Sequence, residues 1–158
     1  MKSQAVKQLE HDMWQHSIDE HPELKRHAEQ TPFGVAGYFP KPQYTDTNAN
    51  GLTRCIIDFI KLHGGQAERI SVMGRPIKQA NGNYMFGKSH MTVGTADISA
   101  TIGGRSVKIE VKIGRDRQSD AQHKYQADIE RAGGLYYIAK DFESFVEWYN
   151  MTFGRAEQ

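Results

Sequence analysis

The sequence predicts an α/β (α+β) fold with a central mixed β-sheet flanked by helices, and three observations support that prediction. A segment in the middle of the chain alternates polar and apolar residues on both sides of Gly103-Gly104, as the two strands of a β-hairpin do. Helical periodicity occurs before and after this segment. The apolar run LYYIA, which follows the second helix, adds a further strand. This order of helices and strands is typical of a layered domain in which helices pack on a sheet.

The first core helix is expected over residues 51–63. Asn50 can cap its start, and Gly64 can end it. Its apolar residues recur with the spacing of one buried helical face, at Leu52, Cys55, Ile56, Phe59 and Ile60. Cys55 is therefore expected in the core and not as a nucleophile, and a single cysteine excludes an internal disulfide. Strands are predicted next over residues 67–73 and within NYMF.

The elements after the hairpin have start and stop signals. Ser119 and Gln122 match a capping box, so a helix is expected to begin near Ser119 and to end at Gly133-Gly134. Its core stripe is predicted to be Tyr125, Ile129 and Ala132. After the strand LYYIA, Asp141 is expected to cap a last helix whose predicted buried residues are Phe142, Phe145, Val146 and Tyr149.

The chain is expected to have two parts. Residues 1–49 are predicted to form an N-terminal accessory arm and connector, and residues 50–158 the main domain. The first part is polar, with helical pieces interrupted near Pro22, and residues 31–50 are dense in proline, glycine and small polar residues, as connectors are. A chain of 158 residues is long enough for one domain with a hydrophobic core.

The hairpin sequence brings two acidic residues opposite each other. If the two glycines form a two-residue turn, Ile102 faces Arg105, and counting back along both strands brings Asp97 opposite Glu110. In this register one face is polar and carries both acids and Lys112, while the other face is apolar. A shift by one residue would turn an acid toward the apolar face, which is costly.

Two opposed carboxylates repel each other unless a cation neutralises them. A hard divalent cation with oxygen ligands, Mg²⁺ or Mn²⁺ as its substitute, suits Asp97 and Glu110. Lys112 on the same face suits a phosphate oxygen or an attacking water. The hairpin alone favours this interpretation no more than a solvated polar face on which Lys108 and Lys112 screen the acids.

An ordered set of short motifs resembles one nuclease superfamily. Asp97 followed by Glu110-Val111-Lys112 resembles the PD-(D/E)XK signature. A larger set is similar to the VRR-NUC branch, which is related to Holliday-junction resolvases: GTAD at 94–97, GR at 104–105, IEVK at 109–112, SDAQ at 119–122 and AGGLY at 132–136. The resemblance covers residues 50–145. Ala96 stands where relatives often have proline, and the first core helix lacks an acid near its start, where many relatives have a glutamate.

The resemblance implies a restriction-endonuclease-like core and a metal-dependent nuclease that hydrolyses phosphodiester bonds in DNA. Asp97, Glu110 and the Val111 carbonyl would hold Mg²⁺, and Lys112 and Gln122 would complete the catalytic set. The expected enzyme is a deoxyribonuclease, an endonuclease in preference to an exonuclease. The resemblance also implies branched or flapped DNA as the substrate and a homodimer as the acting form. The residues themselves indicate neither of these last two properties.

Two assignments at this predicted site stay open. Gln122 has a second explanation, because its side chain can close the capping box on Ser119. The third acidic metal ligand is unassigned, and the acids considered for it are Asp46, Asp58 and Glu68.

The composition and the motifs limit which partners and cofactors can be expected. The net charge is only +1, so DNA affinity is expected from a local cluster formed by Arg105, Lys108, Arg115 and Arg117 together with Lys112. The chain has no glycine-rich nucleotide motif and no histidine or cysteine spacing suited to zinc, so neither a nucleotide cofactor nor a zinc site is expected. No apolar stretch suits a membrane span or an export signal, so we expect a cytoplasmic protein without a membrane partner.

Two other classes of function compete with the nuclease. One is a catalytically silent nucleic-acid-binding module that has kept the nuclease fold. The set of Asp97, Glu110, Lys112 and Gln122 argues against it, because a silent module has no chemical need for all four. The other is an unrelated α/β interaction domain whose acid pair is accidental.

Overall fold

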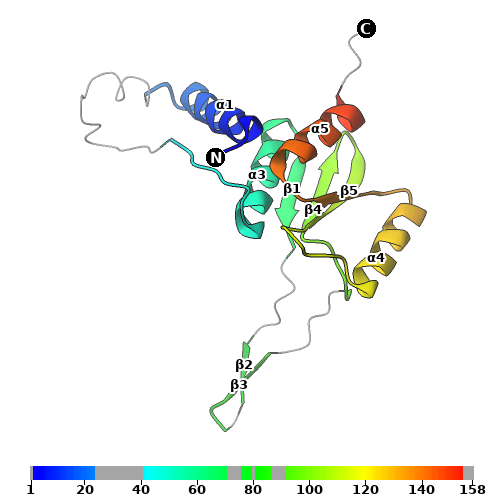
Figure 1. Cartoon of the computed structure of the whole chain (residues 1–158). Helices are drawn as coiled ribbons and strands as arrows, with labels where there is room; N and C mark the ends of the chain where they lie inside the picture. The colour runs from blue at the N-terminus through cyan, green and yellow to red at the C-terminus, as the bar shows by residue number, and fades with distance from the viewer. Residues whose placement is uncertain (1, 24–40, 71–75, 80, 87–91, 155–158) are drawn as a thin grey trace.

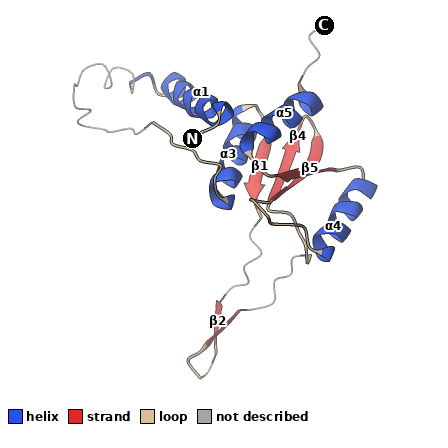
Figure 2. Ribbon diagram, viewed as in Figure 1, coloured by secondary structure: helices blue, strands red, loops and turns tan. Residues whose placement is uncertain are grey.

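The computed structural model describes residues 2–23, 41–70, 76–79, 81–86 and 92–154, and it has a mixed α+β architecture. The described helices are α1 (Gln4–Glu20), α3 (Ala49–Leu62), α4 (Asp120–Arg131) and α5 (Phe142–Phe153). The strands are β1 (Gln66–Arg69), β2 (Pro76–Lys78), β3 (Tyr84–Phe86), β4 (Ile98–Ile102), β5 (Arg105–Val111) and β6 (Leu135–Ala139). Figures 1 and 2 show α3 and α5 together over the main sheet and α4 set apart from them.

The main sheet has four strands in the order β1-β4-β5-β6. β4 pairs antiparallel with both β1 and β5, and β6 pairs parallel with β5, so the sheet is mixed, as predicted. The hairpin register is also confirmed, since Ile102 pairs with Arg105 and Ile98 with Ile109. The two turn glycines have φ values of 55° and 77°. Positive φ at both positions is what a tight hairpin turn requires and what glycine adopts without strain.

The apolar face of this sheet forms the core with α3 and α5. Ile98 of β4 and Ile109 of β5 are fully buried there, and so is Cys55 of α3, as predicted. Burial raises the pKa of the Cys55 thiol to about 12, which keeps it protonated and unreactive. α5 begins after its predicted cap, Asp141, and buries Phe142, Phe145 and Tyr149, with Val146 half-buried.

Two boundaries differ from the sequence predictions. α3 begins at Ala49, and its cap is Asn48 instead of Asn50, because the Asn48 side chain accepts a hydrogen bond from the Gly51 N–H at 2.9 Å. An asparagine caps the amide two or three residues after it, so the earlier of the two asparagines is the one in position. β1 starts at Gln66 and ends at Arg69. The last residues of the strand predicted over 67–73 lie outside the described residues.

The predicted core stripe of α4 is only partly buried. Tyr125 and Ile129 are half-buried, and Ala132 is exposed at the end of the helix. None of the residues of α4 is fully buried. The helix contacts β6 and meets Glu110 on the polar face of the hairpin through Gln122. There is little apolar surface to bury there, and this explains the difference from α3.

α1 docks on the same core as α3 and α5. Val6 and Leu9 are buried in the core cluster, and α1 contacts both helices. The helix ends at Glu20, close to the break predicted near Pro22. The division of the chain into residues 1–49 and 50–158 stays a prediction.

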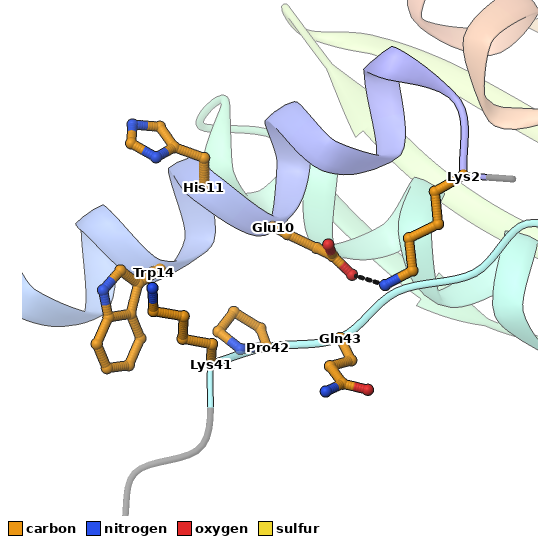
Figure 3. A pocket seen from close by; sticks show the side chains of 7 residues that line it. All are labelled: Lys2, Glu10, His11, Trp14, Lys41, Pro42 and Gln43. Carbon is orange, nitrogen blue, oxygen red and sulfur yellow. Dashed lines mark hydrogen bonds and ion pairs between the residues drawn. The ribbon is translucent and has the colours of Figure 1, made fainter. Parts of the chain in front are cut away.

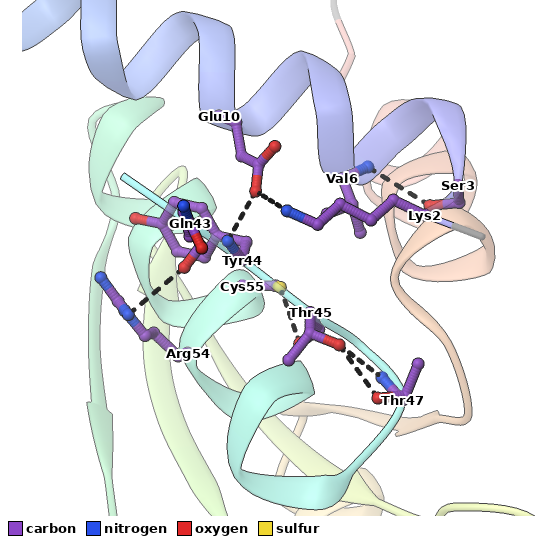
Figure 4. Close-up of polar contacts among 10 residues, drawn as sticks. All are labelled: Lys2, Ser3, Val6, Glu10, Gln43, Tyr44, Thr45, Thr47, Arg54 and Cys55. Atoms are coloured by element: carbon purple, nitrogen blue, oxygen red, sulfur yellow. Dashed lines mark hydrogen bonds and ion pairs between the residues drawn. The ribbon is translucent and has the colours of Figure 1, made fainter. Parts of the chain in front are cut away.

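An extended segment, residues 41–47, which we call the strap, ties α1 to α3 (Figure 4). The N–H of the buried Tyr44 donates to Glu10 Oε1 of α1 at 2.7 Å, and its hydroxyl donates to Asp58 Oδ2 of α3 at 2.7 Å. Lys2 Nζ donates to the same Glu10 oxygen at 2.5 Å. Glu10 and Asp58, the two acids that bond to the strap, thus both have hydrogen-bond donors from within the protein.

The outer end of the strap forms a shallow hollow with α1 (Figure 3). Lys41 Nζ lies 5.9 Å from the centre of the Trp14 ring, within the range of a cation–π contact. The strap therefore contacts α1 at two points, through Lys41 at its start and through Tyr44 at its middle.

β2 and β3 form a separate antiparallel pair that projects from the body of the molecule in Figure 1. β3 coincides with the short strand predicted in NYMF. None of the helices in the described part of the chain is both long and apolar enough to cross a lipid bilayer.

Candidate functional site

Asp97 lies where β4 and β5 separate. The last paired residues of this ladder are Ile98 and Ile109, so Asp97 and Glu110 occupy the next pair of positions in the register without being part of the ladder. Asp97 Oδ2 accepts a hydrogen bond from the Val111 N–H at 2.8 Å. The carboxylate supplies the acceptor that a backbone carbonyl supplies elsewhere in the ladder, and a backbone N–H at this depth requires one. This bond holds Asp97 at the end of the hairpin, beside Glu110.

Glu110 is a buried acid with one unpartnered oxygen. Its side chain is 2% exposed. Oε1 accepts from Gln122 Nε2 and lies 3.1 Å from Lys112 Nζ. Oε2 is buried and has no hydrogen-bond partner among the described residues. A buried acceptor left in this state costs about 1–3 kcal/mol, and more when it is charged. A bound cation or a proton would remove that cost.

Gln122 fills both of the roles that the sequence allows. Its Oε1 accepts from the Ser119 N–H at 2.9 Å, and its own N–H donates to Ser119 Oγ at 3.3 Å, which completes the capping box. Its Nε2 donates to Glu110 Oε1. The cap fixes the amide oxygen on Ser119, and this leaves the amide nitrogen to face Glu110.

Gly94 brings the loop before Asp97 against the first turn of α4. Its φ is 84°, in the left-handed region. A Cβ at Gly94 would lie 2.3 Å from the Ala121 carbonyl oxygen and 2.8 Å from the Gln122 nitrogen. Only glycine permits both this φ and this approach. The loop that contains Gly94 therefore packs directly against the start of α4, and Gln122 lies at this contact.

The electrostatics of the acid and the lysine follow from their burial. Burial raises the pKa of Glu110, the negative charge of Asp97 raises it further, and the hydrogen bond from Lys112 opposes both effects. For Lys112, burial favours the neutral amine, but the bonds to Glu110 and Asp116 outweigh it and the pKa is raised. Lys112 is therefore an ammonium at neutral pH, and Glu110 is an acid poorly neutralised by its surroundings.

A basic hollow of about 820 Å³ opens beside Lys112. It lies where the carboxyl ends of β5 and β6 meet the loop before α4, and its lining residues are Lys112, Gly114, Arg115, Asp116, Arg117, Gln118, His123, Ile138 and Lys140. Four of these are lysine or arginine, and one is a carboxylate. We call this feature the basic hollow. Neither acid lines the hollow, but Lys112 links the two features, since it lines the hollow and its Nζ lies 3.1 Å from Glu110 Oε1.

Lys140 and His123 are among the lining residues of the hollow that the sequence analysis did not identify. Lys140 follows β6 directly, and His123 stands one residue after Gln122 on α4. The signal for Lys140 was present, because parallel strands bring their carboxyl ends to one edge of a sheet, where ligands commonly bind. The parallel pairing of LYYIA with β5 was needed to use that signal, and the sequence did not specify it.

The predicted basic cluster is only partly brought together. Arg115 and Arg117 line the hollow. Arg105 lies at the turn end of β5, and its guanidinium is 6.0 Å from the ring centre of Phe153. Lys108 lies in the middle of β5, between the turn and the hollow, and donates to Ser99 Oγ at 2.5 Å. Neither Arg105 nor Lys108 lines the hollow.

None of the acids considered for the third ligand joins the pair. Asp46 accepts from the Phe142 N–H at 3.3 Å, and Asp58 accepts from Tyr44. Glu68 is exposed on β1, opposite Ser99. Within the described ranges, no three histidine, cysteine, aspartate or glutamate side chains gather as a metal-binding group. Two carboxylates nevertheless suit Mg²⁺, which commonly takes one or two of them with water and substrate oxygens.

Comparison with known proteins gave no matching family model and no matching curated protein. The resemblance to the VRR-NUC family therefore stays a prediction from the motifs. What can be said of function must come from the acid pair, Lys112 and the basic hollow.

Proposed function

We propose that this protein is a metal-dependent nuclease that hydrolyses phosphodiester bonds in DNA, with a restriction-endonuclease-like core of the VRR-NUC type. One observation carries the proposal: the buried, unpartnered Oε2 of Glu110, an acid whose pKa is raised by the charge of Asp97 and whose neighbour Lys112 lines a basic hollow. A structural acid in a folded protein has its donors, as Glu10 does. A buried carboxylate oxygen without a donor is expected where a ligand completes the site.

The acid pair has the right donors for a hard divalent cation. Asp97 and Glu110 would hold Mg²⁺, or Mn²⁺ in its place, and the Val111 carbonyl is a further candidate ligand. When bound, the ion would polarise a phosphoryl oxygen and lower the pKa of a water. Gln122 holds the Oε1 side of Glu110, so that Oε2 is the oxygen left for the ion.

Lys112 is the positive charge closest to the acid pair. Its ammonium is held by Glu110 at 3.1 Å and by Asp116 at 3.4 Å, and it also lines the hollow. A cation fixed in this way can stabilise the negative charge that grows on a phosphoryl group, without having to reorganise during the reaction.

The basic hollow suits the sugar–phosphate backbone on one side of the cleaved bond. Arg115, Arg117 and Lys140 can contact phosphate oxygens there. Such contacts position nucleic acid without reading its sequence. They supply local affinity to a chain whose net charge is only +1. A preference for branched or flapped DNA, and a homodimer, are parts of this proposal that come from the resemblance alone.

A second candidate function is a silent nucleic-acid-binding module with the same fold. The observation that favours it is that no three histidine, cysteine, aspartate or glutamate side chains gather as a metal-binding group in the described part of the chain. A module of this kind would bind DNA through the hollow and would cleave none.

Cleavage assays separate these two candidates. Purified protein is incubated with end-labelled linear duplex, single-stranded, flapped and four-way-junction DNA, with Mg²⁺ or Mn²⁺ and with or without excess chelator. We expect cleavage of at least one substrate that stops on chelation. Cleavage that persists with chelator would contradict the metal mechanism. Tight binding with no cleavage of any substrate would favour the silent module.

A further inference from the structure

Tyr136 carries the second unpartnered polar atom of the interior. In the described part of the chain, two buried side-chain polar atoms lack a hydrogen-bond partner: Glu110 Oε2 and the Tyr136 hydroxyl. Tyr136 pairs with Lys108 and Ile138 with Glu110 in the parallel β5–β6 register. Tyr136 therefore lies on the polar face of the sheet, next to the acid pair.

The side chain of Tyr136 lies on the same sheet face as Glu110, opposite the face that packs on the helical core. Burial raises the pKa of Tyr136 most, and the negative charges of Glu110 and Asp97 raise it further. The hydroxyl therefore keeps its proton at neutral pH. Its ring packs against the ring of Tyr125 in α4, with ring centres 6.4 Å apart and an edge-to-face arrangement.

Gln118 is the polar side chain beside the Tyr136 hydroxyl. Its amide acts as a hydrogen-bond donor toward the hydroxyl oxygen, which lowers the pKa of Tyr136 somewhat, and its Nε2 also donates to Gln126 Oε1 at 3.0 Å. A donor on the oxygen leaves the proton of the hydroxyl without an acceptor. The hydroxyl thus has a rigid support and a proton to donate, but no acceptor among the described residues.

We propose that the Tyr136 hydroxyl is the third oxygen group of the metal site, where it holds a water bound to the divalent cation that Asp97 and Glu110 ligate. The inference rests on the proposed function. It explains why two acids suffice here, since a neutral hydroxyl that positions a bound water takes the place of a third carboxylate. It also accounts for both unpartnered atoms at once, because the same ion and its water give each of them a partner. Tyr136 is in this sense a positioning residue.

The test is Mn²⁺ binding by the full chain, measured calorimetrically without DNA. Tyr136→Phe removes one hydroxyl and leaves the ring against Tyr125. Tyr137→Phe is the matched control, because Tyr137 is the adjacent residue on the opposite face, stacked on Trp148. Glu110→Gln is the reference for loss of a direct ligand. We expect roughly tenfold weaker Mn²⁺ binding for Tyr136→Phe, unchanged binding for Tyr137→Phe and no measurable binding for Glu110→Gln.

Thermal unfolding without metal distinguishes positioning from a structural role. A hydroxyl without a partner contributes nothing to stability when metal is absent, so Tyr136→Phe is expected to unfold at the same or a higher temperature than the wild type. A lower unfolding temperature together with weaker Mn²⁺ binding would mean that the hydroxyl is structural, and would overturn the inference.

The remaining outcomes are also decisive. If Tyr136→Phe binds Mn²⁺ as the wild type does while Glu110→Gln does not, the inference is wrong and the proposed metal site stands. If the wild type binds no Mn²⁺, the proposed metal site fails and the inference fails with it.

Discussion

Two glutamates, Glu10 in α1 and Glu110 in β5, each have two polar partners on Oε1 and differ in how deeply the carboxylate is buried. Glu10 Oε1 accepts from both Lys2 and the backbone of Tyr44, and the side chain remains 22% exposed (Figure 4). Glu110 is 2% exposed, and its Oε2 has no partner in the described part of the chain. One acid is complete in the fold as it stands, and the other is not.

The opposite pKa shifts of these two acids express that difference. Burial alone would raise the pKa of Glu10, but the hydrogen bonds from Lys2 and Tyr44 outweigh it, and the pKa is lowered. For Glu110 burial and the charge of Asp97 prevail over Lys112, and the pKa is raised. The first arrangement stabilises the fold, whereas the second stores a cost that a ligand can relieve. A buried acid is thus informative about function only when its partners are counted.

The largest effect is expected from Asp97→Asn, which should reduce DNA cleavage at least about 100-fold. The asparagine oxygen can still accept from the Val111 N–H, so the fold should survive. Loss of a negative charge near the hollow should leave DNA binding in low salt equal or tighter. Cleavage rates and binding isotherms test this, with Asp120→Asn, an exposed acid in the first turn of α4, as the control. Cleavage by Asp97→Asn at the wild-type rate would remove Asp97 from the site.

The next largest effect concerns the contact between Gly94 and the first turn of α4. Gly94→Ala puts a Cβ 2.3 Å from a backbone oxygen of α4, so the helix must shift, and we expect a loss of unfolding free energy of about 2–4 kcal/mol with reduced cleavage. Gly104→Ala is the matched control, since Gly104 also has positive φ (77°) but nothing within 4 Å of the added Cβ. Its cost should be about 1–2 kcal/mol, with cleavage retained. Denaturant unfolding and cleavage assays measure both. Equal effects on cleavage would show that α4 need not be held by Gly94.

Removing the charge of each glutamate tests directly whether Glu10 stabilises the fold and Glu110 serves the site. Glu10→Gln should lower the unfolding free energy by about 1 kcal/mol at neutral pH and leave cleavage intact. Glu110→Gln should abolish cleavage while the unfolding free energy stays equal or rises, because a neutral amide is less costly to bury than a carboxylate. Denaturant unfolding of the two variants provides the measurement. A large loss of stability in Glu110→Gln would show that Glu110 is a structural acid.

The pH dependence of the same variants has opposite signs. The raised pKa of Glu110 means that the folded state holds its proton more tightly than the unfolded state, so its contribution to stability falls as pH rises from about 4.3, the ordinary glutamate value, through the raised pKa. The lowered pKa of Glu10 gives stability that is present above about 4.3 and is lost as pH falls through the folded value. The gap between wild type and Glu10→Gln should therefore close in acid, and the gain from Glu110→Gln should grow toward neutral pH. Unfolding curves at several pH values test both signs.

The smallest expected effect is on DNA binding through the hollow. Arg117→Ala should weaken binding across sequences and reduce the salt slope by about 1, with the metal site still assembled. Arg105→Ala is matched in chemistry but lies at the turn end of β5, outside the hollow, so it should change binding less. Binding isotherms at two salt concentrations give the slopes. If the two variants weaken binding equally, DNA runs along the whole hairpin and is not confined to the hollow.

Much of the fold was predictable because its signals are local. The register of β4 and β5 follows from the two turn glycines and a period of two, and it came out as expected. The capping box joins Ser119 and Gln122, which are three positions apart, and their residue types alone predict it. The face of α3 that holds Cys55 follows from helical spacing. In each of these cases, neighbours in the sequence are also neighbours in space.

The sequence by itself thus placed Asp97, Glu110 and Lys112 at one end of a hairpin, on one face. Only the tertiary structure decided which of their atoms are satisfied. The state of Glu110 Oε2 depends on distant segments, since β6 pairs with β5 and Gln122 of α4 bonds to the other carboxylate oxygen. The hollow likewise depends on Lys140, which follows β6 in its parallel pairing with β5. Hydrogen-bond satisfaction and burial are properties of contacts between distant segments, which periodicity and short motifs do not encode.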